Sequence, residues 1–151
     1  MRGILIGLAL LAALAANPAA AQDAGALRWL MGKWCADTIE QGKICLTYTP
    51  NADGTIANEW ASQSTDVERP EHSEAVMRIV DGRVTLHSDD QDSDFREVAR
   101  GPNLLVLETT QEDLPAGSVL RVSHRREGDE LVLDMVLVGG EKATNRYKRE
   151  N

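Results

Sequence analysis

Tight-turn signals recur along this chain and separate short segments in which apolar and polar residues alternate. The strongest is Asp81-Gly82, which lies between the alternating segments 74–80 and 83–88 and is typical of a two-residue hairpin turn. Gly101-Pro102-Asn103 and Glu127-Gly128-Asp129 separate later segments in the same way. The spacing predicts about nine or ten short strands joined by tight turns, and no helix longer than two turns.

A meander of this length leaves two unpaired edges unless it closes into a barrel or stacks as two sheets. A two-residue turn at Asp81-Gly82 pairs Ile79 with Val84 and Met77 with Leu86, so these apolar side chains share one face. The same arithmetic at Gly128-Asp129 pairs Leu133 with His124 and Met135 with Val122. We therefore expect an all-β fold, an antiparallel up-and-down barrel of about eight to ten strands whose apolar face includes His124.

The first 21 residues have the organisation of a secretory signal peptide. Met1-Arg2 gives a positive start, residues 4–16 are apolar except for Gly7, and Ala19-Ala20-Ala21 offers small residues for cleavage. The alternative is an uncleaved membrane anchor, but the apolar stretch is shorter than the ~20 residues that span a bilayer, and Asn17-Pro18 ends it. We predict cleavage, a mature single domain over residues 22–151, no membrane insertion, and a bacterial protein that is periplasmic or secreted.

Cys35 and Cys45 are the only two cysteines, and an even number in an exported chain predicts one disulfide. The alternative is a pair of inert buried thiols, whereas the spacing matches neither a redox motif nor a zinc site. If the two cysteines face each other across a hairpin, Trp34 lies opposite Leu46 on the other face. The disulfide would then lie outside the barrel and Trp34 inside it.

Composition argues against several classes of partner and reaction. The chain has a net charge of −8 and a pI near 4.8, which disfavours nucleic acid and anionic membrane surfaces because both require a positive field. Residues 89–94 resemble a calcium loop in acidity, but Phe95 stands where the tight-turn glycine belongs, so a solvated acidic turn is favoured over a weak cation site. No catalytic motif, cofactor motif or metal cluster is predicted, and we expect no enzyme.

Residues 27–34 read Leu-Arg-Trp-Leu-Met-Gly-Lys-Trp, the pattern Leu-x-Trp-Leu-x-Gly-x-Trp. The pattern resembles the entry into small bacterial lipocalin-like domains of the calycin group, several families of which have no assigned function. The resemblance implies a short helical plug over residues 24–31 at one end of the barrel and a first strand that begins at Gly32-Lys33-Trp34. It also implies a cation–π contact between Trp34 and an arginine of the last strand, either Arg146 or Arg149.

Three residues of the second and third predicted strands, Tyr48, Asn58 and Trp60, share the inward face with Ile56. One stacking surface and two hydrogen-bonding groups in an aliphatic lumen suit a small-molecule pocket, although core packing explains the same pattern. His124 is either an inward polar anchor or a partly solvated residue near the rim with no role.

We expect reversible binding of a small, largely apolar molecule, with Trp60 and Tyr48 for stacking, Asn58 and His124 for polar anchoring, and Trp34 as the floor. The alternative is a filled barrel that acts as a protein-interaction or inhibitor module in the cell envelope, where an acidic surface would suit a basic partner. A barrel-type cyclase or isomerase would require His124 within hydrogen-bonding reach of a carboxylate or tyrosine.

Overall fold

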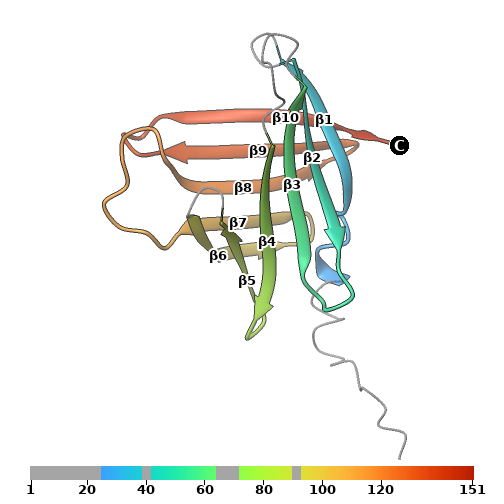
Figure 1. The fold of residues 1–151 in the computed structure, drawn as a ribbon, viewed down its shortest axis with the longest axis horizontal. Helices are drawn as coiled ribbons and strands as arrows, with labels where there is room; N and C mark the ends of the chain where they lie inside the picture. The colour runs from blue at the N-terminus through green and yellow to red at the C-terminus, as the bar shows by residue number, and fades with distance from the viewer. Residues whose placement is uncertain (1–24, 39–41, 64–71, 90–92) are drawn as a thin grey trace, which may run out of the picture.

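The computed structural model describes residues 25–38, 42–63, 72–89 and 93–151, so the predicted signal peptide lies outside the described residues. Ten antiparallel strands close into a barrel in which each strand pairs with the next and β10 pairs with β1 (Figure 1). The strands are β1 (Gly32–Thr38), β2 (Gly42–Pro50), β3 (Ile56–Gln63), β4 (His72–Val80), β5 (Arg83–Ser88), β6 (Ser93–Gly101), β7 (Leu104–Thr109), β8 (Val119–Glu127), β9 (Glu130–Leu137) and β10 (Lys142–Glu150). The predicted all-β, up-and-down closed barrel is confirmed.

The predicted strand register is also confirmed. Trp34 pairs with Leu46 on β2, Met77 with Leu86 on β5, and His124 with Leu133 on β9. Alternate residues therefore face a common interior, and most of the fully buried side chains belong to this inward set. No helix in the described part of the chain is long and apolar enough to cross a bilayer.

Residues 25–31 precede β1; residues 25 and 26 are helical, and residues 27–30 form turns. Their backbone hydrogen bonds link residues three apart, including Arg28 N–H to the Gly25 carbonyl and Leu30 N–H to the Leu27 carbonyl. Leu27 and Leu30 are fully buried and join the hydrophobic core. Only residues 25 and 26 of the predicted plug over 24–31 have helical backbone, and residue 24 lies outside the described residues, so the helical plug remains a prediction.

Trp34 is fully buried, and two arginine side chains lie close to its indole ring. The guanidinium carbon of Arg149 is 5.3 Å from the ring centroid, and that of Arg126 is 5.9 Å from it. The indole N–H donates to the Leu30 carbonyl at 2.8 Å. The last-strand arginine over Trp34 is therefore Arg149, whereas Arg146 forms ion pairs with Glu127 and Glu130 on the surface.

The disulfide joins Cys35 of β1 to Cys45 of β2, as predicted, on the face opposite Trp34. It strengthens a strand whose other side is weakly paired, since only residues 33–35 of β1 pair with β10. Beyond Cys35, β1 and β10 are no longer paired, and a small cavity of about 170 Å³ lies beside them. We call this region the β1–β10 seam; its lining includes Ala36, Thr38, Ile44, Asn145 and Tyr147.

Two β-bulges interrupt the regular register, one between Glu97 and Ala99 in β6 and one between Val119 and Arg121 in β8. The first places Val98 on the surface and turns the Glu97 carboxylate toward β5, where it accepts a hydrogen bond from Val84 N–H at 2.8 Å. Arg100 also donates to this carboxylate, at 2.6 Å. Glu97 therefore replaces a backbone acceptor at a point where β5 and β6 are not paired.

Candidate ligand-binding site

The barrel has two different ends. Residues 25–31 and the tight turns that contain Asp81-Gly82 and Gly128-Asp129 lie at one end, which we call the turn end. The other end, which we call the mouth, carries the connection between β7 and β8. A cavity of about 580 Å³, partly open to solvent, lies toward the mouth. Four residues of this connection and three serines near strand ends help to line it: Gln111, Leu114, Gly117, Ser118, Ser73, Ser88 and Ser93.

Most of the cavity wall is apolar. The larger apolar side chains come from five different strands and face one another across the lumen because each occupies an inward position of its strand. They are Leu46, Trp60, Leu86, Phe95, Leu133 and Met135. A cavity of this volume with a mainly apolar wall and a few polar groups is typical of small-molecule sites.

The polar part of the wall contains two buried atoms that make no hydrogen bond within the protein, Asn58 Oδ1 and His124 Nδ1. Across the described residues, only one other buried side-chain polar atom is in this condition, Trp29 Nε1. Buried polar atoms are normally paired, because leaving one unpaired costs about 1–3 kcal/mol. Two of the three atoms thus belong to residues of the cavity wall, although the atoms themselves are shielded from the cavity.

Tyr48 connects these two groups. It lies opposite Asn58 in the pairing of β2 with β3. Its ring meets the His124 ring edge-on, with centroids 6.1 Å apart and an interplanar angle of 81°. Tyr48 and His124 are 2% and 3% exposed, so these groups form a buried polar cluster, which we call the Asn58–Tyr48–His124 cluster.

The titration of the cluster reflects its burial. Burial lowers the pKa of His124 to about 4, although a hydrogen bond with the backbone of Leu105 acts in the opposite direction. Burial also raises the pKa of the Tyr48 hydroxyl, and the neighbouring Tyr147 adds to this effect. At neutral pH both side chains are therefore uncharged.

Four of the five predicted ligand-binding residues lie together in the cavity wall: Tyr48, Asn58, Trp60 and His124. Trp34 does not line the cavity; it is fully buried, with Arg126 and Arg149 close to its ring. Several further members of the wall were not predicted as site residues. The predicted register had placed two of them, Leu86 and Met135, on the inward face of the barrel. Gln111 and Leu114 lie in a connection whose sequence has no periodic pattern and so gave no signal.

No aspartate, glutamate, lysine or arginine contributes to the described cavity wall. His124 Nδ1 has no hydrogen-bond partner, and Tyr48 meets the ring by an edge contact. Among the described residues of the wall, His124 is therefore not paired with a carboxylate.

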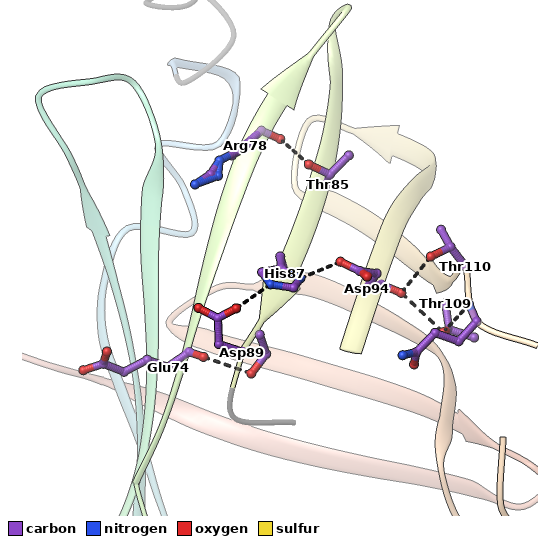
Figure 2. A network of polar contacts seen from close by, with 10 residues as sticks. Glu74, Arg78, Thr85, His87, Asp89, Asp94, Thr109 and Thr110 are labelled. Carbon is purple, nitrogen blue, oxygen red and sulfur yellow. Dashed lines mark hydrogen bonds and ion pairs between the residues drawn. The ribbon is translucent and has the colours of Figure 1, made fainter. Parts of the chain in front are cut away.

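His87 lies on the outer face of β5, opposite Val76, where the register places it. Figure 2 shows its ring between two carboxylates: Nδ1 is 2.6 Å from Asp94 and Nε2 is 2.7 Å from Asp89. Hydrogen bonds to Asp94 and Asp89 raise the pKa of His87. All three side chains are about half exposed or more, so this acidic turn has the character of a solvated surface network, and residues 90–92 are not described.

No protein-family model matches this sequence, and a comparison with curated proteins finds no match.

Proposed function

We propose that this protein is an exported lipocalin-like carrier that binds a small, largely apolar molecule reversibly in the barrel lumen. The observation that carries the proposal is the cavity of about 580 Å³, in which a mainly apolar wall includes a few polar side chains. An apolar guest would gain from leaving water, and a polar group on it would meet the polar side chains of the wall. Residues 25–31 would close the turn end, so that the guest enters through the mouth.

The experiment uses the neutral fluorescent probe N-phenyl-1-naphthylamine, whose emission rises in apolar surroundings. We expect saturable enhancement with the wild-type protein and energy transfer from tryptophan, because Trp60 is part of the cavity wall. Replacing Ala75, a small wall residue, by phenylalanine fills part of the lumen and should weaken binding about tenfold or more.

The matched control is Val80→Ala, which changes a 53% exposed side chain on β4 outside the cavity wall. Its affinity for the probe should equal that of the wild type. Unchanged binding by the Ala75→Phe variant would place the probe outside the lumen and contradict the proposal, provided that circular dichroism shows the variant folded.

The alternative, a filled barrel that acts as an interaction or inhibitor module, has less support, since a lumen used only for stability would be packed throughout. The acidic composition still suits a basic partner. Failure of every apolar probe to bind would favour this second function.

Export rests on residues 1–21 and agrees with a disulfide between Cys35 and Cys45. Expression of the full chain in a bacterial host should give a periplasmic protein that begins at Gln22, as shown by intact mass. A protein of full mass in the membrane fraction would instead identify an uncleaved anchor.

A further inference from the structure

Three charged side chains form a network on the outer surface beside the mouth of the barrel (Figure 2). His87 is the second-last residue of β5, and its ring contacts Asp89 through Nε2 at 2.7 Å and Asp94 of β6 through Nδ1 at 2.6 Å. We call these three residues the His87 clasp. The neighbouring Ser88 and Ser93 pair with each other and line the cavity, so the clasp lies directly behind the cavity wall.

The clasp also supports the connection between β7 and β8, which helps to line the cavity. The backbone carbonyl of Asp94 accepts hydrogen bonds from Thr110 N–H at 3.0 Å and from the Thr109 hydroxyl at 3.3 Å. The same hydroxyl oxygen accepts from Gln111 N–H at 3.2 Å, and Gln111 is part of the cavity wall. Asp94 therefore links His87, through its side chain, to the start of this connection, through its backbone.

The geometry of the clasp requires the charged form of His87. A neutral imidazole donates from one nitrogen only and would turn the lone pair of the other toward a carboxylate oxygen. The imidazolium donates from both nitrogens, so it satisfies Asp94 and Asp89 together. In agreement with this geometry, hydrogen bonds to Asp94 first and Asp89 second raise the pKa of His87.

Other charged groups face the clasp from the neighbouring strands. Among the described residues, the register places Glu74 and Arg78 of β4 and Arg96 of β6 next to His87 on the outer face. Carboxylates and guanidinium groups normally keep their charge between pH 6 and 9, whereas histidine titrates near this range. His124 is outside this range because its pKa is about 4. The third histidine of the sequence, His72, lies 3.7 Å from Glu74.

We propose that the His87 clasp is a pH-dependent latch on the mouth. While the ring is charged, it holds together β5, β6 and the start of the β7–β8 connection. When the ring loses its proton, it satisfies only one of the two carboxylates, the mouth loosens, and the guest exchanges faster. The proposal rests on the proposed function and adds to it how release is regulated. The clasp side chains are about half exposed or more, so the effect on the rate is about two- to fivefold.

The test measures the dissociation rate of N-phenyl-1-naphthylamine, a neutral probe, by stopped-flow dilution of the loaded wild-type protein between pH 6 and 9. We expect the rate to rise about two- to fivefold, with a midpoint at the pKa of His87 measured by NMR. His87→Gln is uncharged at every pH, so its rate should be fast already at pH 6 and constant. The matched control is His72→Gln, an exposed histidine beside a carboxylate at the start of β4, which should behave as the wild type.

The variant Asp94→Asn assigns the titration to the clasp. It keeps the backbone carbonyl that supports Thr110 and removes one negative charge from the ring. The pKa of His87 measured by NMR should therefore fall, and the midpoint of the dissociation profile should move to lower pH with it. A midpoint that stays in place while the pKa of His87 moves would assign the pH dependence to another group and contradict the proposal.

Hydrogen exchange of the Thr110 amide monitors the clasp without a guest, because this N–H is bonded to the Asp94 carbonyl. After correction for the intrinsic pH dependence of exchange, its protection should fall by a similar factor between pH 6 and 9 in the wild type and stay constant in His87→Gln. Constant protection in the wild type would overturn the latch.

Two failures are distinguishable. A probe that binds but leaves at a rate independent of pH, or equally dependent on pH in His87→Gln, would overturn the latch and leave a binding protein. A probe that gives no saturable enhancement at any pH would instead refute the proposed function, and control of guest release would fail with it.

Discussion

Gly32 has a role that no other residue could fill easily. Its φ of +112° lies in a region that favours glycine, and a Cβ added there would lie 3.1 Å from Nη2 of Arg149. Arg149 in turn covers the Trp34 ring and donates to the Met31 carbonyl at 3.1 Å. The small size of Gly32 therefore lets one arginine hold the residue 25–31 turn against the last strand.

We predict that Gly32→Ala lowers the free energy of unfolding by about 2 kcal/mol or more, from backbone strain and from displacement of Arg149. The control is Gly140→Ala, where φ is +87° and the added Cβ would meet nothing within 4 Å. The Gly140→Ala variant has only the backbone strain of a positive φ, and its free energy of unfolding should fall by about 1 kcal/mol. Urea unfolding of both variants measures the difference; equal losses would mean that Arg149 moves aside without cost.

The pKa of His124 predicts how stability depends on pH. Because the pKa is about 4 in the folded protein and 6.5 for an unperturbed histidine, the unfolded chain binds a proton first as the pH falls. The contribution of neutral, buried His124 to the free energy of unfolding is fully present above pH 6.5 and declines by about 3 kcal/mol between pH 6.5 and 4.

Urea unfolding of wild type and His124→Gln at pH 7, 6 and 5 tests this pH dependence. The wild type should lose stability on acidification, and the variant should lose distinctly less. His87 acts in the opposite sense and in another window: its raised pKa adds stability below pH 6.5 that is lost as the pH rises through the raised value. Identical slopes for wild type and variant would contradict the assignment of a buried neutral His124.

Among the structural elements, the pairing of β5 with β6 depends on a side chain. Glu97 and Arg100 are 11% and 18% exposed, and the carboxylate also accepts from Val84 N–H. Burial by itself would raise the pKa of Glu97, but the hydrogen bonds from Arg100 and Val84 hold it below its ordinary value. The bulge at residues 97–99 is therefore a specific connection between strands.

We predict that Glu97→Leu costs about 3 kcal/mol of unfolding free energy, because the largely buried Arg100 guanidinium loses the Glu97 carboxylate and Val84 N–H loses its acceptor. Glu108→Leu is the control, since Glu108 and its partner Arg121 are 40% and 52% exposed and such a pair contributes less than about 1 kcal/mol. Thermal unfolding of the two variants compares them, and a small effect at Glu97 would show that water replaces the carboxylate.

The sequence predicted the elements well where alternation and turn chemistry agree. The Asp81-Gly82 turn determined the register of the hairpin that it closes. The Cys35–Cys45 pair determined the register that places Trp34 opposite Leu46. The bulges were not predictable, because one inserted residue leaves the alternating pattern almost unchanged. For the same reason the role of Glu97, which depends on the bulge, was missed.

The site was predictable to a similar degree. Tyr48, Asn58, Trp60 and His124 lie in one wall because the side-chain period of two places each on the inward face. The sequence does not reveal how far along the barrel axis each residue lies, so Trp34 was predicted as a floor although it is sealed below the cavity. The barrel length and stagger that determine this position come only from closure.

Considered as a whole, the barrel is closed most weakly at the β1–β10 seam. Only residues 33–35 of β1 pair with β10, whereas β1 pairs with β2 over the full span 32–38. The small cavity lined by Ala36, Asn145 and Tyr147 lies within this seam. Local opening should therefore begin at this edge.

We predict that hydrogen exchange of backbone amides in residues 36–38 and 143–146 that face the seam is at least about tenfold faster than in the paired centre of β8 and β9. Mass spectrometry or NMR of the native protein measures this. The Cys35–Cys45 disulfide limits the opening from the β2 side, so reduction should increase exchange in residues 36–38. Uniform protection across all strands would contradict a weak seam.

The first strand begins and the last strand ends at the same end of the barrel. Gly32 begins β1 and Glu150 ends β10 at the turn end, where Lys33 lies opposite Glu150. The cavity lies toward the mouth, at the other end of the barrel. Whatever is joined to either end of residues 25–151, whether a label, a solid support or a second protein, would project away from the mouth. Such a tethered barrel would keep its entrance toward the solution, which makes this scaffold suited to surface-bound sensing of the molecule it carries.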